Sequence, residues 1–421
     1  MAGLTAARSL AESGRNVLIL EASSRPGGRI LTVRHAGQSI ELGAEFIHGR
    51  PPELWSLIEE AGLETYELNG PHLSFEDGQL ISGPAQKTEE DERFEILDHL
   101  SSYTGPDISF AEYLDQYPLS NEARLEAIGY VEGFNAADHR AISVQALGLQ
   151  QAAEDTIDGD RLFRIQAGYD RLPGFLAERI AAAGGSIRYN TLVERIEWAP
   201  GRVQIEANSE GQPLVFHAAQ AVIAVPLGVL QQNAISFFPT PDPLHEARRL
   251  RMGQVRRFTL LFRDKFWASS AAAQSIGDFS FLFAFDAMPP VWWTPHPAET
   301  ATITGWIGGP RSAALANLTA AQLAQRACEA LAPIVSLEPK AIRSRLIDCF
   351  THDWQRDALF SGAYSYVPAG ALDACSKMTI PADNTLFFAG EHTDTTGHWG
   401  TVHAAMRSGL RAAQQILQSG R

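Results

Sequence analysis

The first residues carry apolar side chains at the spacing of a helix, and a short apolar run follows them. This pattern predicts a helix followed by a buried strand. Residues 1–13 fit a helix, which Gly14 would end. Residues 16–21 then form a short apolar run that ends in Glu21, a pattern typical of parallel sheets. This is the second half of a βαβ unit, whose first strand and turn are missing. We therefore expect a natural start roughly 10 to 40 residues upstream, with a further strand of about five or six residues.

The middle of the chain predicts a helical segment and then a region of strands. Residues 51–151 are expected to be mostly helical, from the apolar spacing of Leu54, Ile58 and Ala61, and again of Phe94, Leu97 and Leu100. A helix is expected over 171–183, and another begins at Thr319, where Gln322 completes a capping-box pattern. Strands are expected at 186–189, 192–198, 203–207, 221–225, 258–262 and 302–307.

The end of the chain repeats the pattern of its beginning. Residues 385–391 predict a buried strand that ends in Glu391, and a closing helix follows with Met406, Leu410, Ala413 and Leu417 on one face. Strand, acid and helix at both chain ends indicate one α/β nucleotide-binding domain built from distant segments. We assign residues 1–50, 160–235 and 376–421 to this domain. Residues 51–159 and 236–375 would form an α+β substrate-binding domain.

Composition narrows the class of protein. The 421 residues are 45% hydrophobic and 20% charged, which excludes disordered and fibrous proteins. An apolar run of membrane-spanning length is absent from the sequence, and three scattered cysteines are too few for a disulfide framework or a zinc site. A soluble protein of a reducing compartment, the cytoplasm, is therefore expected. The net charge of −15 disfavours nucleic acid and anionic membranes as partners, and it serves either solubility or a cationic substrate.

A candidate phosphate-binding segment follows the first strand. Glu21 stands 18 residues after Gly3, close to the spacing between the last glycine of a dinucleotide-binding turn and the acid that binds a ribose hydroxyl. Gly27 and Gly28 allow a close approach of the backbone, and the planar fork of Arg29 suits a phosphate. A surface turn with a solvated arginine is the structural alternative.

The whole pattern resembles the flavin-containing amine oxidases, the family of monoamine oxidase, polyamine oxidases and lysine-specific histone demethylases. Eight segments in the family's order carry the resemblance: 21–30, 41–49, 167–180, 221–230, 265–267, 353–366, 387–393 and 400–413. The resemblance implies a Rossmann-like FAD-binding domain of the glutathione-reductase type with a substrate-binding domain. It also implies FAD as the cofactor and oxidation of a carbon–nitrogen bond.

Carried over position by position, the resemblance implies which residues hold FAD. Glu21 would bind the adenosine ribose, Arg29 the pyrophosphate, and Val193 the adenine through its backbone. The segment 43–46 would run along the flavin ring, and Ala363 stands where some members attach the flavin through cysteine, so non-covalent binding is expected. The cofactor set is Gly3, Glu21, Ala22, Gly28, Arg29, Gly43, Ala44, Glu45, Phe46, Val193, Trp354, Gly390, Glu391, Thr401 and Val402.

The substrate side departs from the family pattern at two positions. Tyr364 falls on one of two positions where aromatic residues flank the amine, but the other is Thr401, as in the demethylases. Arg257 stands where the family carries a lysine that contacts the flavin through water, and Lys265 is out of register. Arginine keeps the positive charge but does not release its proton, so Arg257 is either a substitute for that lysine or a structural ion-pair partner. His48 either touches the substrate or is structural.

The resemblance implies a soluble enzyme that oxidises a primary or secondary amine, with a polyamine as one candidate, to an imine. Dioxygen would be the electron acceptor and hydrogen peroxide a product. Another flavin enzyme of this fold, a desaturase or an amino-acid oxidase, is one alternative, and a non-catalytic or truncated flavin-fold protein is another. Spacing along the sequence reveals no metal site, and the amine and the oligomeric state stay open. Because the first strand is missing, we expect the chain as written to be poorly soluble or to bind FAD weakly.

Overall fold

The computed structural model of this protein describes residues 1–82, 96–268 and 276–419. The helices are α1 (Ala2–Glu12), α2 (Pro52–Glu60), α4 (Phe110–Leu114), α5 (Asn121–Asn135), α6 (Val144–Asp155), α7 (Arg171–Ala182), α8 (Leu227–Gln231), α9 (Pro243–Ala247), α10 (Ala320–Ile334), α11 (Pro339–Arg343), α12 (Ala374–Met378) and α13 (Val402–Ser419). Short 3₁₀ turns cover η1 (Leu100–Ser102), η2 (Pro310–Leu315) and η3 (Glu391–Thr393).

The strands are spread over the whole chain. They are β1 (Leu18–Leu20), β2 (Thr32–His35), β3 (Gln38–Glu41), β4 (Ile47–His48), β5 (Thr65–Glu67), β6 (His72–Glu76), β7 (Gln79–Ser82), β8 (Leu162–Ile165), β9 (Ser186–Arg188), β10 (Leu192–Ala199), β11 (Arg202–Ser209), β12 (Gln212–Ala218), β13 (Ala221–Ile223), β14 (Ser236–Phe238), β15 (Arg251–Met252), β16 (Val255–Phe262), β17 (Phe281–Phe283), β18 (Val291–Trp293), β19 (Thr302–Gly308), β20 (Leu346–Thr351), β21 (Ser365–Tyr366) and β22 (Leu386–Phe388).

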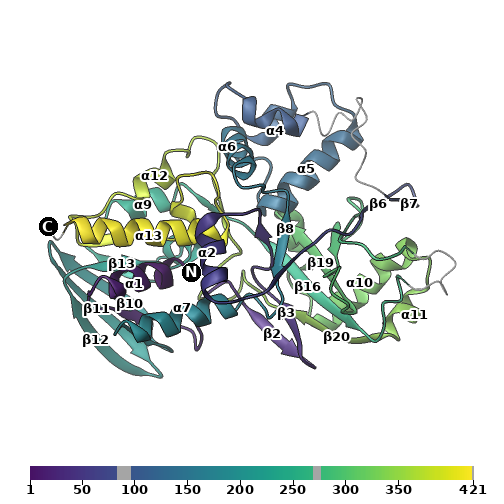
Figure 1. The fold of residues 1–421 in the computed structure, drawn as a ribbon. Helices are drawn as coiled ribbons and strands as arrows, with labels where there is room; N and C mark the ends of the chain where they lie inside the picture. The colour runs from purple at the N-terminus through teal and green to yellow at the C-terminus, as the bar shows by residue number, and fades with distance from the viewer. Residues whose placement is uncertain (83–95, 269–275, 420–421) are drawn as a thin grey trace.

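The first and last helices lie side by side. Figure 1 shows the yellow α13 along the purple α1, and the two helices pack against each other. Gly409 makes this contact possible, because a Cβ atom there would lie 2.3 Å from the carbonyl oxygen of Ala2. The two ends of the sequence therefore build one part of the molecule.

Two pairs of parallel strands accompany these helices. β1 pairs with β9, and β13 pairs with β22, so each pair joins segments far apart in the sequence. In the described residues the two pairs are separate two-stranded sheets. β10, β11 and β12 form an antiparallel sheet whose other edge is β14.

A mixed sheet of seven strands forms the other large part of the molecule. Its strand order is β20-β16-β19-β18-β17-β6-β7. The sheet packs on α10 through a core that includes Trp292, Phe258 and Leu323, and all eight residues of β16 are buried. In Figure 1 the helices α4, α5 and α6 gather at the top, beside this sheet.

Most elements expected from the sequence are confirmed. The helices at 1–13, 171–183 and 319 onward are present as α1, α7 and α10, and α10 has the complete Thr319–Gln322 capping box. The expected strands are confirmed as β1, β9, β10, β11, β13, β16, β19 and β22, and the closing helix as α13. None of the described helices is long and apolar enough to cross a membrane.

The expectation of a mostly helical segment over 51–151 is wrong in part. This segment contains β5, β6 and β7, and Leu97 and Leu100 lie in a short turn of helix and in η1. β6 is fixed by parallel pairing with β17, more than two hundred residues later, which local apolar spacing does not reveal. Phe94 lies outside the described residues. The domain boundaries stay a prediction.

We expect Gly409→Ala to lower the free energy of unfolding by roughly 2 kcal/mol, because the added methyl group would push α13 away from the backbone of α1. In an open helix the same change is stabilising. Gly174→Ala is the matched control, since α7 leaves its Cβ position without neighbours within 4 Å. Chemical denaturation of the purified protein measures both changes, and an equal effect at the two glycines would contradict the α1–α13 contact.

Candidate active site

One large cavity in the described part of the chain is lined by residues from both ends and from the middle of the sequence. Its volume is about 1540 Å³, more than the roughly 300–1,000 Å³ of an ordinary small-molecule pocket. Residues of both parallel strand pairs line it, so the cavity includes the space between β1 and β13. From there it extends to the start of α13 and to the aromatic face of the seven-stranded sheet.

All the residues expected to bind a cofactor or substrate line this cavity. They are Gly3, Glu21, Ala22, Gly28, Arg29, Gly43, Ala44, Glu45, Phe46, His48, Val193, Arg257, Trp354, Tyr364, Gly390, Glu391, Thr401 and Val402. The segments that carry them are up to four hundred residues apart in the sequence. Their roles stay predictions, but their convergence on one cavity is a property of the fold.

The segment after β1 forms a tight turn held by its own side chains. The carboxylate of Glu21 accepts hydrogen bonds from the backbone nitrogen and the hydroxyl of Ser23, each at 2.8 Å. Arg25, which sequence reasoning missed, donates to the carbonyl oxygens of Gly28 at 2.7 Å and Ile30 at 2.6 Å. Gly28 has φ of 61°, where glycine is favoured. Arg25 therefore fixes the glycine turn that carries Arg29 toward the cavity.

Glu391 is a buried carboxylate that joins three segments. It accepts hydrogen bonds from the guanidinium of Arg29 at 2.8 Å, the hydroxyl of Ser365 at 2.5 Å and the backbone nitrogen of Gly400 at 3.0 Å. Burial by itself would raise the pKa of Glu391, but Arg29 and the other hydrogen-bond donors outweigh it, so the pKa is lowered. Arg29 also donates to the carbonyl oxygen of Ala363 at 2.8 Å.

A second buried network holds the segment at 43–46. The guanidinium of Arg257 donates to the carbonyl oxygen of Gly43 at 2.7 Å and pairs with the carboxylate of Glu45. Glu45 also pairs with Arg164 at 2.8 Å and accepts from the indole of Trp293 at 3.1 Å. Burial lowers the pKa of Arg257. Arg257 therefore ties β16 to the segment that lines the cavity.

The neighbouring cations of Arg257 have other partners. Arg256 faces away, donates to the carbonyl oxygen of Leu318 at 3.0 Å and lies 3.1 Å from Asp353. Lys265 pairs with Asp278 and Glu299. Of the three, only Arg257 lines the cavity.

Tyr364 and Thr401 are held next to each other at the start of α13. The Tyr364 ring packs on Gly400, where a Cβ atom would lie 2.8 Å from the ring, and its hydroxyl donates to the carbonyl oxygen of Phe134 at 2.7 Å. Burial raises the pKa of Tyr364, so its hydroxyl stays protonated at neutral pH. The Thr401 hydroxyl accepts from the backbone nitrogen of Ala404 at 3.1 Å and caps α13.

An aromatic wall continues from this point. The Phe46 ring lies 5.4 Å from Trp293 and 5.8 Å from Phe281 between centroids, and His48 contacts Phe46 and Phe134 edge to face. Burial lowers the pKa of His48 to about 4, so its imidazole is neutral at physiological pH. This wall gives the cavity a dry end beside Tyr364.

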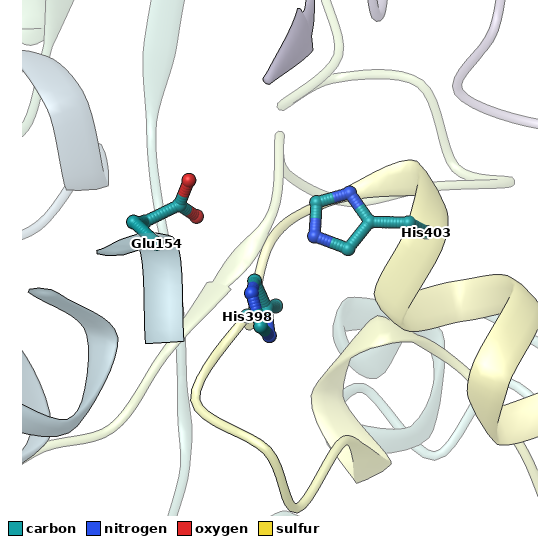
Figure 2. Close-up of side chains that lie close together, drawn as sticks. All are labelled: Glu154, His398 and His403. Carbon is teal, nitrogen blue, oxygen red and sulfur yellow. The ribbon is translucent and has the colours of Figure 1, made fainter. Parts of the chain in front are cut away.

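Sequence reasoning missed one polar cluster at the cavity. Glu154 at the end of α6, His398 in the preceding loop of α13, and His403 in its first turn bring ligand atoms within 4.8 Å of one another (Figure 2). Glu154 carries no local signal, and it stands more than two hundred residues before the two histidines in the sequence. Only the contact between the end of α6 and the loop before α13, where His398 hydrogen-bonds to the carbonyl oxygen of Ala153, brings them together.

Comparison with known proteins gives consistent matches. A family model described as flavin containing amine oxidoreductase matches residues 1–417. Polyamine oxidase 3 of Oryza sativa subsp. japonica is 30% identical over 449 residues, which cover 98% of this chain and 87% of that protein. Lysine-specific histone demethylase 1 homolog 2 of Arabidopsis thaliana is 28% identical over 462 residues. That match covers 99% of this chain but 57% of the relative, so this chain spans little more than half of its length.

Solved structures share the fold. A redesigned putrescine oxidase superposes with a TM-score of 0.84 at 21% identity, covering 99% of this chain and 97% of that chain. Cyclohexylamine oxidase from Brevibacterium oxydans IH-35A gives 0.82 at 22% identity, covering 100% and 97%. These likenesses confirm the expected fold class.

We expect Glu391→Gln to lower the free energy of unfolding at neutral pH by roughly 3 kcal/mol, because it removes the buried partner of Arg29. Since the folded state lowers the pKa of Glu391, this stabilisation is present above the ordinary carboxyl value of 4.5 and is lost as the pH falls through the folded value. The difference in the free energy of unfolding between wild type and variant should therefore become smaller at acid pH. Urea unfolding at several pH values measures it, with Glu59→Gln on the exposed face of α2 as control. A difference in the free energy of unfolding that does not change with pH would contradict the stabilising role of the Glu391 carboxylate.

Proposed function

Since this chain belongs to the flavin-containing amine oxidoreductase family, we propose that it oxidises a primary or secondary amine to an imine, with dioxygen as electron acceptor. The single observation that carries the proposal is the cavity that joins the expected cofactor residues to Tyr364 and Thr401. Water would hydrolyse the imine to an aldehyde or ketone, and dioxygen would leave as hydrogen peroxide. The names of the relatives, polyamine oxidase and putrescine oxidase, support an amine as substrate.

The residues that line the cavity fit FAD, the cofactor of the family. Glu21 follows β1 at the place where a ribose-binding acid is expected, and Gly43 lies so close to Arg29 that a Cβ atom would be 1.9 Å from its carbonyl oxygen. The first turn of α13 faces the same cavity through Thr401 and Val402. Its backbone N–H groups carry a partial positive charge that stabilises an anion.

A bound FAD would supply the two-electron redox chemistry, as acceptor of a hydride equivalent from the amine and donor of electrons to dioxygen. The protein supplies orientation and a dry environment. Tyr364, packed on Gly400 and bonded to Phe134, would fix one side of the amine, and Thr401 would leave the other side open for a larger substituent. The neutral imidazole of His48 and the aromatic wall add no charge that competes with the reaction.

The proposal predicts that the protein purified or reconstituted with FAD shows the yellow absorbance of oxidised flavin. After acid precipitation the colour should stay in the supernatant, because Ala363 offers no atom for a covalent bond. Colour retained in the pellet would contradict non-covalent binding.

Anaerobic mixing with an amine should bleach the flavin, and air should restore its absorbance with release of hydrogen peroxide. A loaded protein that no amine bleaches would refute amine oxidation.

A second prediction concerns the buried cation behind the segment 43–46. Arg257→Lys keeps the charge but cannot span both Gly43 and Glu45, so we expect it to change reoxidation by dioxygen more than reduction by the amine. Stopped-flow traces measure the two half-reactions. Arg256→Lys, on the opposite face of β16, is the matched control. If neither half-reaction changes in Arg257→Lys, the role of Arg257 is structural alone.

A further inference from the structure

A histidine next to the cavity packs against one of the residues that line it. Trp354 lines the cavity and is only 4% exposed, and its indole nitrogen donates to the carbonyl oxygen of Leu42 at 2.8 Å. The ring of His352 lies 4.3 Å from the Trp354 ring between centroids, at an angle of 57°. His352 does not itself line the cavity. It therefore supports a residue of the cavity wall without being part of that wall.

The imidazole of His352 is held in turn by Asp357. Its Nε2 atom lies 3.0 Å from one carboxylate oxygen of Asp357, and because a carboxylate accepts hydrogen bonds, Nε2 is the donor. The other carboxylate oxygen accepts from the backbone nitrogen of Leu359 at 3.0 Å. The side chains of His352 and Asp357 are both partly exposed, so the pair lies where the core meets solvent. Asp357 therefore fixes the orientation of the ring that packs on Trp354.

The pair belongs to a loop that closes on itself. The backbone carbonyl oxygen of Trp354 accepts from the backbone nitrogen of Gly362 at 2.8 Å, and that of Asp357 accepts from the backbone nitrogen of Phe360 at 3.0 Å. The ring of Phe360 also packs on Trp354 at 5.0 Å between centroids. Compact loops of this kind are held by their own side chains. Because Tyr364 stands two residues after Gly362, the loop that carries Trp354 also leads into Tyr364.

Trp354 connects this loop to the segment expected to run along the flavin ring. A Cβ atom on Gly43 would lie 3.1 Å from the indole of Trp354, and the preceding carbonyl of Leu42 accepts the indole proton. The carbonyl oxygen of Gly43 is bound separately by Arg257 at 2.7 Å. Because the interior is closely packed, a displaced indole would move the backbone at 42–43 with it. The position of Trp354 therefore affects the shape of the cavity beside Gly43.

We propose that His352 and Asp357 are positioning residues, which hold the Trp354 indole against residues 42–43 and so shape the part of the cavity expected to receive the flavin ring. The inference rests on the proposed function only for the identity of the cofactor, since the contacts belong to the protein alone. Neither residue lines the cavity, so neither takes part in the chemistry. A site holds its geometry when a second layer of contacts supports it. The two residues act as one unit, because the His352 ring touches the indole and Asp357 orients that ring.

The first measurement uses the protein without cofactor. The fluorescence of Trp354 is isolated by subtracting the spectrum of the same protein carrying Trp354→Phe, in wild type and in each variant. We expect His352→Ala to shift the Trp354 emission to longer wavelength and to strengthen its quenching by acrylamide, because the indole gains contact with water. His35→Ala is the matched control, since His35 packs edge to face on Phe350 at 5.6 Å and neither residue lines the cavity. The control should leave the Trp354 emission unchanged.

The second measurement is the Kd for FAD, from titration of the cofactor-free protein. We expect His352→Ala to raise this Kd roughly 3- to 10-fold, as the loss of one charge-assisted hydrogen bond and its ring contact would. Asp357→Asn should raise it by a similar factor, and the double variant should raise it no further than His352→Ala, because the two residues act as one unit. His352→Phe keeps a ring on the indole without the hydrogen bond and should give an intermediate Kd.

The outcomes separate the positioning role from the proposed function. An unchanged Trp354 emission or an unchanged FAD Kd in His352→Ala would overturn the proposal. Effects of the single variants that multiply in the double variant would overturn it as well, and so would an equal change in His35→Ala, which would indicate a general loss of stability. If wild type binds FAD but no amine bleaches it, amine oxidation fails while the positioning role stands. If wild type binds no FAD, the proposed function fails, and the Trp354 emission by itself decides the role of His352.

Discussion

The carboxylate of Glu391 is the contact on which the arrangement of this protein depends. It binds Arg29 from the first segment, Ser365 from the end of the middle segment, and the backbone of Gly400 before the last helix. These three points surround one cavity. A buried carboxylate is tolerated only when donors surround it, so each segment must be in place for the others to be stable. The hydrogen bonds to Glu391 therefore hold these three segments around the cavity.

The same principle distinguishes two other buried carboxylates of the cavity. Glu45 is satisfied by Arg257, Arg164 and Trp293, and this network fixes the segment at 43–46 behind the cavity wall. Glu154 and His403 lie in the same cavity with buried atoms that have no hydrogen bond in the described residues. The carboxylate of Glu45 is satisfied by partners within the protein, whereas the carboxylate of Glu154 has none among the described residues.

The backbone geometry of Gly400 determines the position of the Tyr364 ring. Gly400 has φ of 80° and no side chain, so the aromatic ring can lie directly on it, and the Tyr364 hydroxyl donates a hydrogen bond to the carbonyl oxygen of Phe134. Thr401 uses its hydroxyl to cap α13. Hydrogen bonds within the protein therefore hold both the Tyr364 ring and the Thr401 side chain in place.

The sequence by itself determined the local elements and the motifs. Helix α10 with its capping box and the strands β1 and β22 with the acids that follow them come from patterns within a few residues, and the resemblance to a known family pointed to most of the expected cofactor residues. Tertiary structure alone decided the rest. β6 is a strand because β17 pairs with it, Arg257 meets Glu45 from across two hundred residues, and Glu154 lies near His398 and His403 only because the end of α6 meets the loop before α13. Local patterns record the preferences of the backbone, while the partner of a buried charge depends on which distant segment arrives beside it.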